Sequence, residues 1–163
     1  MKRILSLFII FALLSTLFTA CGSQKNNDPS CADILNDVME NTEEYDTIFV
    51  AGDDTLENNY DNMYAIKRDI VDDCGILYLE EGGLANELSL FHMKDSGDVQ
   101  LAKDKLQDRL ATRRNQFAGY KPEEVYKLDN AVVMAQGNFV ALIVSEDPSM
   151  MESVLRQAIT DNQ

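Results

Sequence analysis

The chain has no tryptophan, only three prolines and a single histidine, His92, among its 163 residues. A lone histidine lacks the neighbouring groups that identify a catalytic site. The sequence also contains no HExxH motif, no P-loop, no dinucleotide-binding glycine pattern and no nucleophile elbow. We therefore expect no catalytic residues, no cofactor and no bound metal ion, and we interpret His92 as a partly buried strand residue.

Basic residues are scarce as well. Lys and Arg number 14 against 28 Asp and Glu, which gives a formal net charge of −14. A protein this acidic does not neutralise phosphate groups overall, and it is repelled by anionic polymers. We exclude nucleic acid as a partner.

The longest apolar segment lies at the N-terminus, and it does not reach the roughly 20 residues that cross a bilayer. After Lys2 and Arg3, the apolar segment 4–18 is followed by Thr19-Ala20-Cys21. A positive start, an apolar centre and small residues at the cleavage position are typical of a secretory signal. Residues 1–20 are predicted to be a cleaved signal peptide.

The cysteine after the cleavage position favours anchoring over plain secretion, in which it would be incidental. Residues 17–21, Leu-Phe-Thr-Ala-Cys, resemble the bacterial lipobox, which implies that the Cys21 sulfur receives a diacylglyceryl group. Two or more acyl chains on one residue suffice for lasting membrane attachment. We expect a lipoprotein on the extracytoplasmic face of the cell membrane, with residues 21–30 as a flexible tether of roughly 15–18 Å reach.

Cys31 and Cys74 remain once Cys21 is acylated. Outside the cytoplasm, an even pair of cysteines is compatible with a disulfide. Neither lies in a CxxC or Cys–His pattern, and a domain of this size does not need a crosslink. The sequence does not decide between a Cys31–Cys74 disulfide and two free thiols.

Residues 31–163 are predicted to form one α+β domain, because the hydrophobic periodicity alternates between helix and strand types. Helices are expected at about 31–42, 98–117, 122–128 and 148–158, and hairpins at 74–80 with 87–93 and at 131–136 with 139–145. Residues 43–62 fit a short strand or a loop. This order favours a four-stranded antiparallel sheet, built from the two hairpins, with helices packed on one face.

The longest predicted helix is expected to cover the sheet with an apolar stripe. The stripe consists of Val99, Ala102, Leu106, Leu110 and Phe117. The same helix carries Lys105, Arg109 and Arg113 at spacings of four residues, which could bind anions. We favour the alternative that their stems flank the apolar face while their charged heads pair with the surplus carboxylates.

The acidic segment 53–62 could offer oxygen ligands to calcium, but it lacks the ligand spacing of a calcium-binding loop. We interpret it as a solvated loop. Glu123 and Glu124 are expected to be first-turn acids of a short helix. As partners for His92 in catalysis, Glu87 and Ser89 are suggested only by their closeness in the sequence.

Several short motifs together are similar to one known family. They are Tyr64-Ala65-Ile66, Ala85-Asn86-Glu87-Leu88-Ser89-Leu90-Phe91, Arg109, Phe117-x-x-Tyr120-x-Pro122-x-Glu124, Asn130-Ala131-Val132 and Gly137-Asn138-Phe139-Val140. Over about residues 57–159 the chain resembles the domain of unknown function 4358 family. The resemblance implies a lipoprotein of clostridia or related Gram-positive bacteria and carries no catalytic residues. Ala65 stands where a glycine is more usual, and Asn86 where an aspartate is more usual.

The sequence thus predicts a non-enzymatic binding or interaction module of the bacterial cell envelope. Its partners are expected to be the membrane, through lipid on Cys21, and an envelope protein or a small ligand. The alternative is a small envelope enzyme that uses carboxylate or histidine chemistry. A pocket with two carboxylates about 5–10 Å apart would favour the enzyme, and an exposed apolar surface would favour a partner.

Overall fold

The computed structural model describes residues 29–79 and 83–163, so the predicted signal peptide, Cys21 and most of the tether lie outside the described residues. The main elements are α2 (Cys31–Glu40), β1 (Thr47–Val50), α3 (Asp54–Tyr64), β2 (Val71–Tyr78), β3 (Glu87–Met93), α4 (Val99–Tyr120), α5 (Val125–Asp129), β4 (Val132–Gln136), β5 (Phe139–Val144) and α6 (Pro148–Asp161). Single 3₁₀ turns occur at Arg68–Ile70, Ser96–Asp98 and Pro122–Glu124. Among the described helices, none has the length and apolar character to cross a membrane.

The strands form one antiparallel sheet in the order β1-β2-β3-β5-β4. The α+β class and both predicted hairpins, β2–β3 and β4–β5, are confirmed. The predicted number of four strands is wrong, because β1 pairs with β2 and adds a fifth. This strand has only four residues, all half-buried, inside a polar segment, and a run that short carries no readable periodicity.

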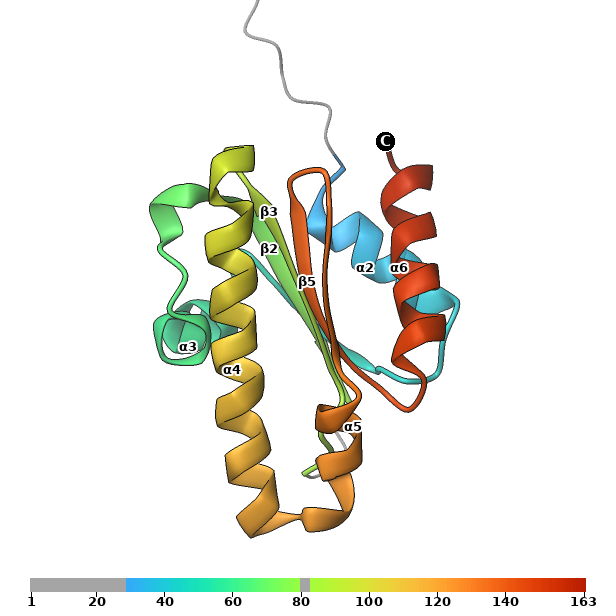
Figure 1. The fold of residues 1–163 in the computed structure, drawn as a ribbon. Helices are drawn as coiled ribbons and strands as arrows, with labels where there is room; N and C mark the ends of the chain where they lie inside the picture. Colours follow the sequence, from blue (N-terminus) through green and yellow to red (C-terminus); the bar gives the residue numbers. More distant parts are fainter. Residues whose placement is uncertain (1–28, 80–82) are drawn as a thin grey trace, which may run out of the picture.

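Helices cover both faces of the sheet, as Figure 1 shows: α3 and α4 lie on one side, α2 and α6 on the other. The prediction of helices on one face is therefore wrong. The reason is visible in β3 and β5, whose residues are buried along their whole length. Phe91 and Leu142 face the α3–α4 side, and Leu88 and Leu90 face the α2–α6 side. A strand inside three layers has no solvent face, so no polar alternation marks it.

Helix α4 covers its face of the sheet as the apolar stripe predicts. Ala102, Leu106 and Phe117 are buried, and Val99 and Leu110 are half-buried against the same cluster. On the opposite face, α2 approaches β2 closely. At Gly75 an added Cβ would lie 2.6 Å from Leu35 Cδ1, so a side chain there would require Leu35 to shift.

The outer edge of the sheet at β4 is capped by a side chain from α6. Arg156 Nη1 donates hydrogen bonds to the Ala135 backbone carbonyl and to Gln136 Oε1, both at 3.3 Å. The Arg156 guanidinium is itself held by Glu152, one turn earlier, with Nη2 2.7 Å from Oε1. A charged group therefore occupies part of the row of backbone groups that β4, as an edge strand, leaves without a neighbouring strand.

Candidate functional site

A fully buried carboxylate, Glu87, begins β3 on the side that faces α4. Arg109 binds it through two parallel hydrogen bonds, Nε to Oε1 and Nη2 to Oε2, each 2.7 Å long. Arg113, one helical turn later, donates from Nη1 to Oε2. Such two-pronged contacts are the strongest that arginine makes with a carboxylate. Since burying an unpaired carboxylate is very unfavourable, the two arginines are what permits Glu87 at this position.

Hydroxyl groups complete the coordination of Glu87. Tyr64 Oη, from the end of α3, lies 3.0 Å from Oε1 and 2.8 Å from Ser89 Oγ. Ser89 also donates to Glu87 Oε1, while Arg109 Nη2 donates to Tyr78 Oη at 3.0 Å. We call Tyr64, Glu87, Ser89, Arg109 and Arg113 the Glu87 cluster. It joins α3, β3 and α4 in one polar network inside an otherwise apolar core.

The charges of the cluster hold its groups in fixed protonation states. Burial by itself raises the pKa of Glu87, but Arg113, Arg109 and the hydrogen bonds from Arg109 and Ser89 outweigh it and lower the pKa to about 2. Burial and the charge of Glu87 raise the pKa of Tyr64 well above its usual value, and they raise that of Tyr78 to about 12. Glu87 is therefore ionised, and both tyrosines are neutral, throughout the physiological range.

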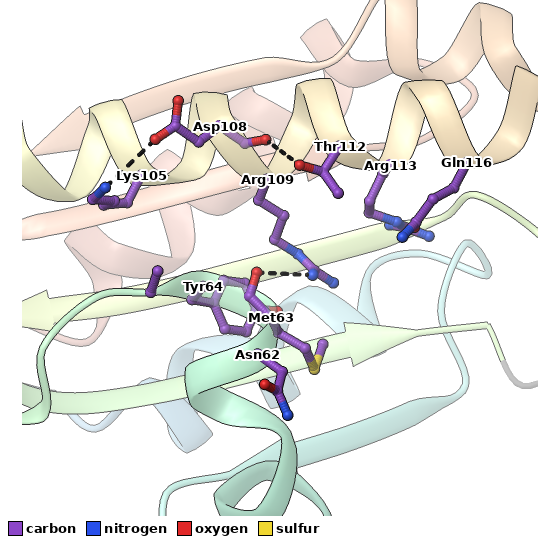
Figure 2. A pocket seen from close by; sticks show the side chains of 10 residues that line it. Asn62, Met63, Tyr64, Lys105, Asp108, Arg109, Thr112, Arg113 and Gln116 are labelled. Carbon is purple, nitrogen blue, oxygen red and sulfur yellow. Dashed lines mark hydrogen bonds and ion pairs between the residues drawn. The ribbon is translucent and has the colours of Figure 1, made fainter.

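A pocket of about 330 Å³ opens over this cluster, between the end of α3 and one side of α4. Figure 2 shows Arg109 pointing from α4 towards Tyr64 and Met63, with Arg113 and Gln116 side by side at one end and Lys105 and Asp108 at the other. The lining is completed by Asn62, Ala65 and Thr112. The volume is at the lower end of the range for ligand-binding pockets, roughly 300–1,000 Å³.

The floor of this pocket carries an uncompensated positive charge. Two guanidinium groups, of Arg109 and Arg113, share the single carboxylate of Glu87. The other two charged lining groups pair with each other, Lys105 Nζ lying 3.5 Å from Asp108 Oδ2. The floor of the pocket is thus positively charged, although the chain as a whole has a formal net charge of −14.

A second polar centre surrounds Lys127 at the other side of the β3 start. The Lys127 side chain is 4 % exposed, and its Nζ lies 3.1 Å from Glu124 Oε2, 2.9 Å from Glu146 Oε1 and 2.9 Å from Asn86 Oδ1. A wider depression of about 650 Å³ opens beside it, with Glu44 and Met150 among its lining residues. Glu124 has a larger role than that of a first-turn acid, because it also accepts the Ala85 backbone N–H at 3.0 Å.

The two carboxylates at Lys127 are close enough for a glycosidase pair, which spans about 5–10 Å. That chemistry needs one carboxyl group with a raised pKa, so that it stays protonated as the acid. Here burial tends to raise the pKa of Glu124, but the Ala85 N–H and Lys127 lower it. The Tyr126 hydroxyl and Lys127 lower that of Glu146 as well. Both groups are ionised at neutral pH, and neither is the acid of such a pair.

His92 is buried, as a strand histidine should be, with 5 % of its surface exposed. Its ring stacks on Phe139 at 4.3 Å, and its Nδ1 lies 3.5 Å from Asp72 Oδ2. Because side chains alternate along β3, the sheet places His92 on the opposite face from Glu87 and Ser89. The catalytic grouping suggested by closeness in the sequence therefore does not form.

The acidic segment 53–62 is helical, where we expected a loop, because it contributes most of α3. Asp53 precedes the helix and accepts the Val50 backbone N–H at 2.7 Å. Glu57 accepts the Gly52 N–H at 3.0 Å and pairs with Arg68. Over residues 29–79 and 83–163, no group of three or more acidic, histidine or cysteine side chains is arranged to hold a metal ion.

Cys31 and Cys74 are both buried and both free in the structure. Cys31 belongs to the apolar cluster on the α2–α6 face, and Cys74 to the cluster on the α3–α4 face. Burial raises the pKa of Cys74 to about 11, despite Arg68 Nη1 at 3.2 Å from its sulfur. Both residues therefore act as small core side chains in this conformation.

The basic residues of α4 pair with carboxylates, as we favoured, but the decisive partner was missed. Arg109 and Arg113 do not reach surface acids; they bind the buried Glu87. The sequence holds a signal for this arrangement. Arg109 and Arg113 continue the spacing of the apolar stripe between Leu106 and Phe117, so both charges point at the core and require a buried counter-charge.

Comparison with family models finds one match, described as "Domain of unknown function (DUF4358)", over residues 52–145. The match covers more than half of the chain and contains the whole Glu87 cluster, and the chain belongs to this family. No curated protein and no solved structure matches.

Proposed function

We propose that this member of the DUF4358 family is a binding module of the bacterial cell envelope, held on the extracytoplasmic face of the membrane by lipid on Cys21. The observation that carries the binding role is the pocket between α3 and α4, with its positively charged floor over the Glu87 cluster. The anchoring part rests on the signal peptide and the lipobox resemblance of residues 17–21.

The pocket supports binding rather than turnover. A general acid or base works best when its pKa lies near the working pH. Beneath this pocket, the pKa of Glu87 is about 2 and that of Tyr78 about 12, while the pKa of Tyr64 is raised further. These groups hold one protonation state while a ligand comes and goes. They do not exchange protons with a ligand at pH 7, and the guanidinium groups that Glu87 holds in place can orient the ligand by charge and hydrogen bonding.

The cluster also makes the pocket rigid, which favours affinity. Arg109 is fixed by Glu87, by Tyr78 and by the Met63 backbone carbonyl, to which Nη1 donates at 3.1 Å. Its guanidinium lies over the Tyr64 ring, 4.4 Å from the centroid. A ligand that binds against side chains already held in place does not have to immobilise them.

Anchoring is tested by metabolic labelling with a palmitate analogue. The wild-type protein should carry the label and fractionate with membranes, and Cys21→Ser should lose both. Cys31→Ser is the matched control and should keep the label. A Cys21→Ser protein that still carries the label would end the lipoprotein part of the proposal.

Binding is tested in intact cells with a photo-reactive amino acid on α4. Placed at Gln116, which lines the pocket, it should capture a ligand or partner under illumination. Gln107 is an exposed residue of the same helix outside the pocket lining, and the same amino acid there should not capture it. Equal products at both positions, or none at either, would contradict a binding role for this pocket. A captured small molecule that is chemically converted over time would favour the enzyme alternative.

A further inference from the structure

We infer that the pocket between α3 and α4 binds a carboxylate group, and that the free edge of Arg113 receives it. This inference rests on the proposed binding role and adds the chemical class of the ligand. It starts from the unequal use of the two arginines of the Glu87 cluster.

All three guanidinium nitrogens of Arg109 donate to protein partners, whereas only one nitrogen of Arg113 does. Arg109 uses Nε, Nη1 and Nη2 in hydrogen bonds to Glu87, Met63 and Tyr78. Arg113 uses only Nη1, which donates to Glu87 and to the Ala85 backbone carbonyl at 3.1 Å. Within the described part of the chain, Nε and Nη2 of Arg113 have no hydrogen-bond acceptor. The Arg113 side chain is nevertheless only 11 % exposed, and it lines the pocket.

The geometry of these unused donors selects the ligand. The N–H groups on Nε and Nη2 of a guanidinium are parallel, and they match the two oxygens of a carboxylate. Nη1, on the far side, is fixed by Glu87, and the ring of Phe117 lies 5.2 Å from the guanidinium carbon. The guanidinium is thus held through Nη1, while the edge formed by Nε and Nη2 remains for a ligand.

Charge supports a singly charged anion. Arg109 and Arg113 exceed Glu87 by one positive charge, and Lys105 is paired with Asp108. One carboxylate balances this excess, whereas a phosphate that carries close to two charges leaves one unpaired in a half-enclosed site. Phosphate is therefore the competing oxyanion that the experiment has to separate.

Two amides at the pocket rim suit the remainder of such a ligand. Asn62 and Gln116 both line the pocket, and neither side-chain amide makes a hydrogen bond to another residue in the segments that the structure describes. Side-chain amides donate and accept, so they can pair with amide or hydroxyl groups of the ligand. Met63 and Ala65 offer apolar contacts beside them. The site fits a small acylated amino acid or the C-terminus of a peptide.

The first test uses the full chain, purified in detergent, and three probes in titration calorimetry at low salt. N-acetylglycine should bind, and its neutral analogue N-acetylglycinamide should bind at least about tenfold more weakly, because it lacks the charge that the guanidinium pairs with. Inorganic phosphate should also bind more weakly than N-acetylglycine. Tighter binding of phosphate, or equal binding of the acid and its amide, would overturn the inference.

The second test moves a charge without touching the Glu87 cluster. Gln116→Glu places a negative charge beside Arg113, and the affinity for N-acetylglycine should fall on the order of five- to tenfold at low salt. Gln107→Glu adds the same charge to the same helix outside the pocket and should change the affinity by less than about twofold. Equal effects from both variants would show only a general charge effect and would overturn the assigned site.

The third test replaces the donor itself. Arg113→Lys keeps the charge but has no paired N–H edge, so the affinity should fall at least about tenfold while circular dichroism and the melting transition confirm folding. If this variant does not fold, Gln116→Glu decides alone. A neutral ligand captured at Gln116 in cells, together with no binding of N-acetylglycine, would remove the carboxylate inference and leave the proposed binding role standing.

Discussion

The two faces of the sheet are covered by helices in similar ways but differ in chemistry. On the α2–α6 side the buried residues form an apolar cluster around Leu77, Leu88 and Leu90. On the α3–α4 side an apolar cluster of similar size surrounds Glu87, with Arg109 and Arg113 reaching into it. The same strand, β3, supplies Leu88 to one face and Glu87 to the other.

The difference shows what each face contributes. An apolar face stabilises through area removed from water and tolerates changes that keep its volume. An ionic cluster gives little net stability, since pairing mainly offsets the penalty of desolvating its charges, and it fails when one partner is lost. The cluster does, however, fix donors and charge beneath a pocket. The face that contributes less net stability is therefore the one that we assign to binding.

The sharpest way to break this comparison is one volume-conserving change on each face. Glu87→Gln keeps the shape but leaves two buried guanidinium groups without a counter-charge, and we expect a loss of about 3–5 kcal/mol in the free energy of unfolding. Leu88→Met, the adjacent residue on the apolar face, should cost less than about 1.5 kcal/mol. Denaturant unfolding of both variants gives the two values. Equal losses would mean that the two faces do not differ energetically as argued.

The next largest effect is expected from the apolar part of the α4 face. Leu106 is fully buried, so Leu106→Ala should cost about 2–5 kcal/mol through lost burial and a residual cavity. On the other face, His92→Gln changes the stacking on Phe139 and the contact with Asp72 and should cost about 0.5–1.5 kcal/mol. Denaturant midpoints measure both. A silent Leu106→Ala would contradict the packing of α4 on the sheet.

Acid should weaken the α4 face through Glu87. Its folded pKa of about 2 lies below the usual carboxyl value, so its contribution to stability is complete above about pH 4.3 and is lost as the pH falls towards 2. Protonation of Glu87 should therefore cost the folded state about 3 kcal/mol relative to the ionised cluster. In ¹³C spectra, the Glu87 carboxyl signal should remain that of the ionised form down to about pH 3. A midpoint near pH 4 would show that the arginines do not hold the charge.

The smallest expected effect concerns the end of α3, next to the pocket. Ala65 has a φ of +51°, in the left-handed region, where α3 ends. Glycine takes this conformation without steric strain, so Ala65→Gly should stabilise the protein by about 0.5–1 kcal/mol, as a net of relieved strain and lost entropy. Thermal unfolding measures the gain. A destabilised variant would mean that Ala65 is not strained.

Much of the fold was predictable because it depends on local patterns. The stripe of α4 and the two-residue turn at Gly137-Asn138 each act within a few residues of the chain, and both hairpins and the long helix are confirmed. The second helical layer was not predictable in the same way. Strands β3 and β5 are buried on both sides, and uniformly apolar strands do not tell which elements cover them.

The site was harder to predict, since its residues are distant in the sequence and lie on different types of element. Tyr64 is the last residue of a helix most of which, residues 54–62, we expected to be a loop. Glu87 begins a strand, and Arg109 and Arg113 lie within a helix. Their pairing depends on the packing of α4 across β3, which is a tertiary contact that local sequence patterns do not encode. The one local indication of this packing was that two arginines share the spacing of an apolar stripe.

Arg156 at the outer edge of β4 has a consequence for how copies of the protein behave towards one another. An edge strand with free backbone groups is a template on which a strand of another molecule can dock, and this is a common route to aggregation. The hazard is greatest where molecules are concentrated in two dimensions, as the proposed lipid anchor would concentrate them on a membrane surface. By donating to the Ala135 carbonyl, Arg156 places a charge and an occupied acceptor where a docking strand would have to pair. A strand that docked at this edge would therefore have to displace Arg156 from the Ala135 carbonyl.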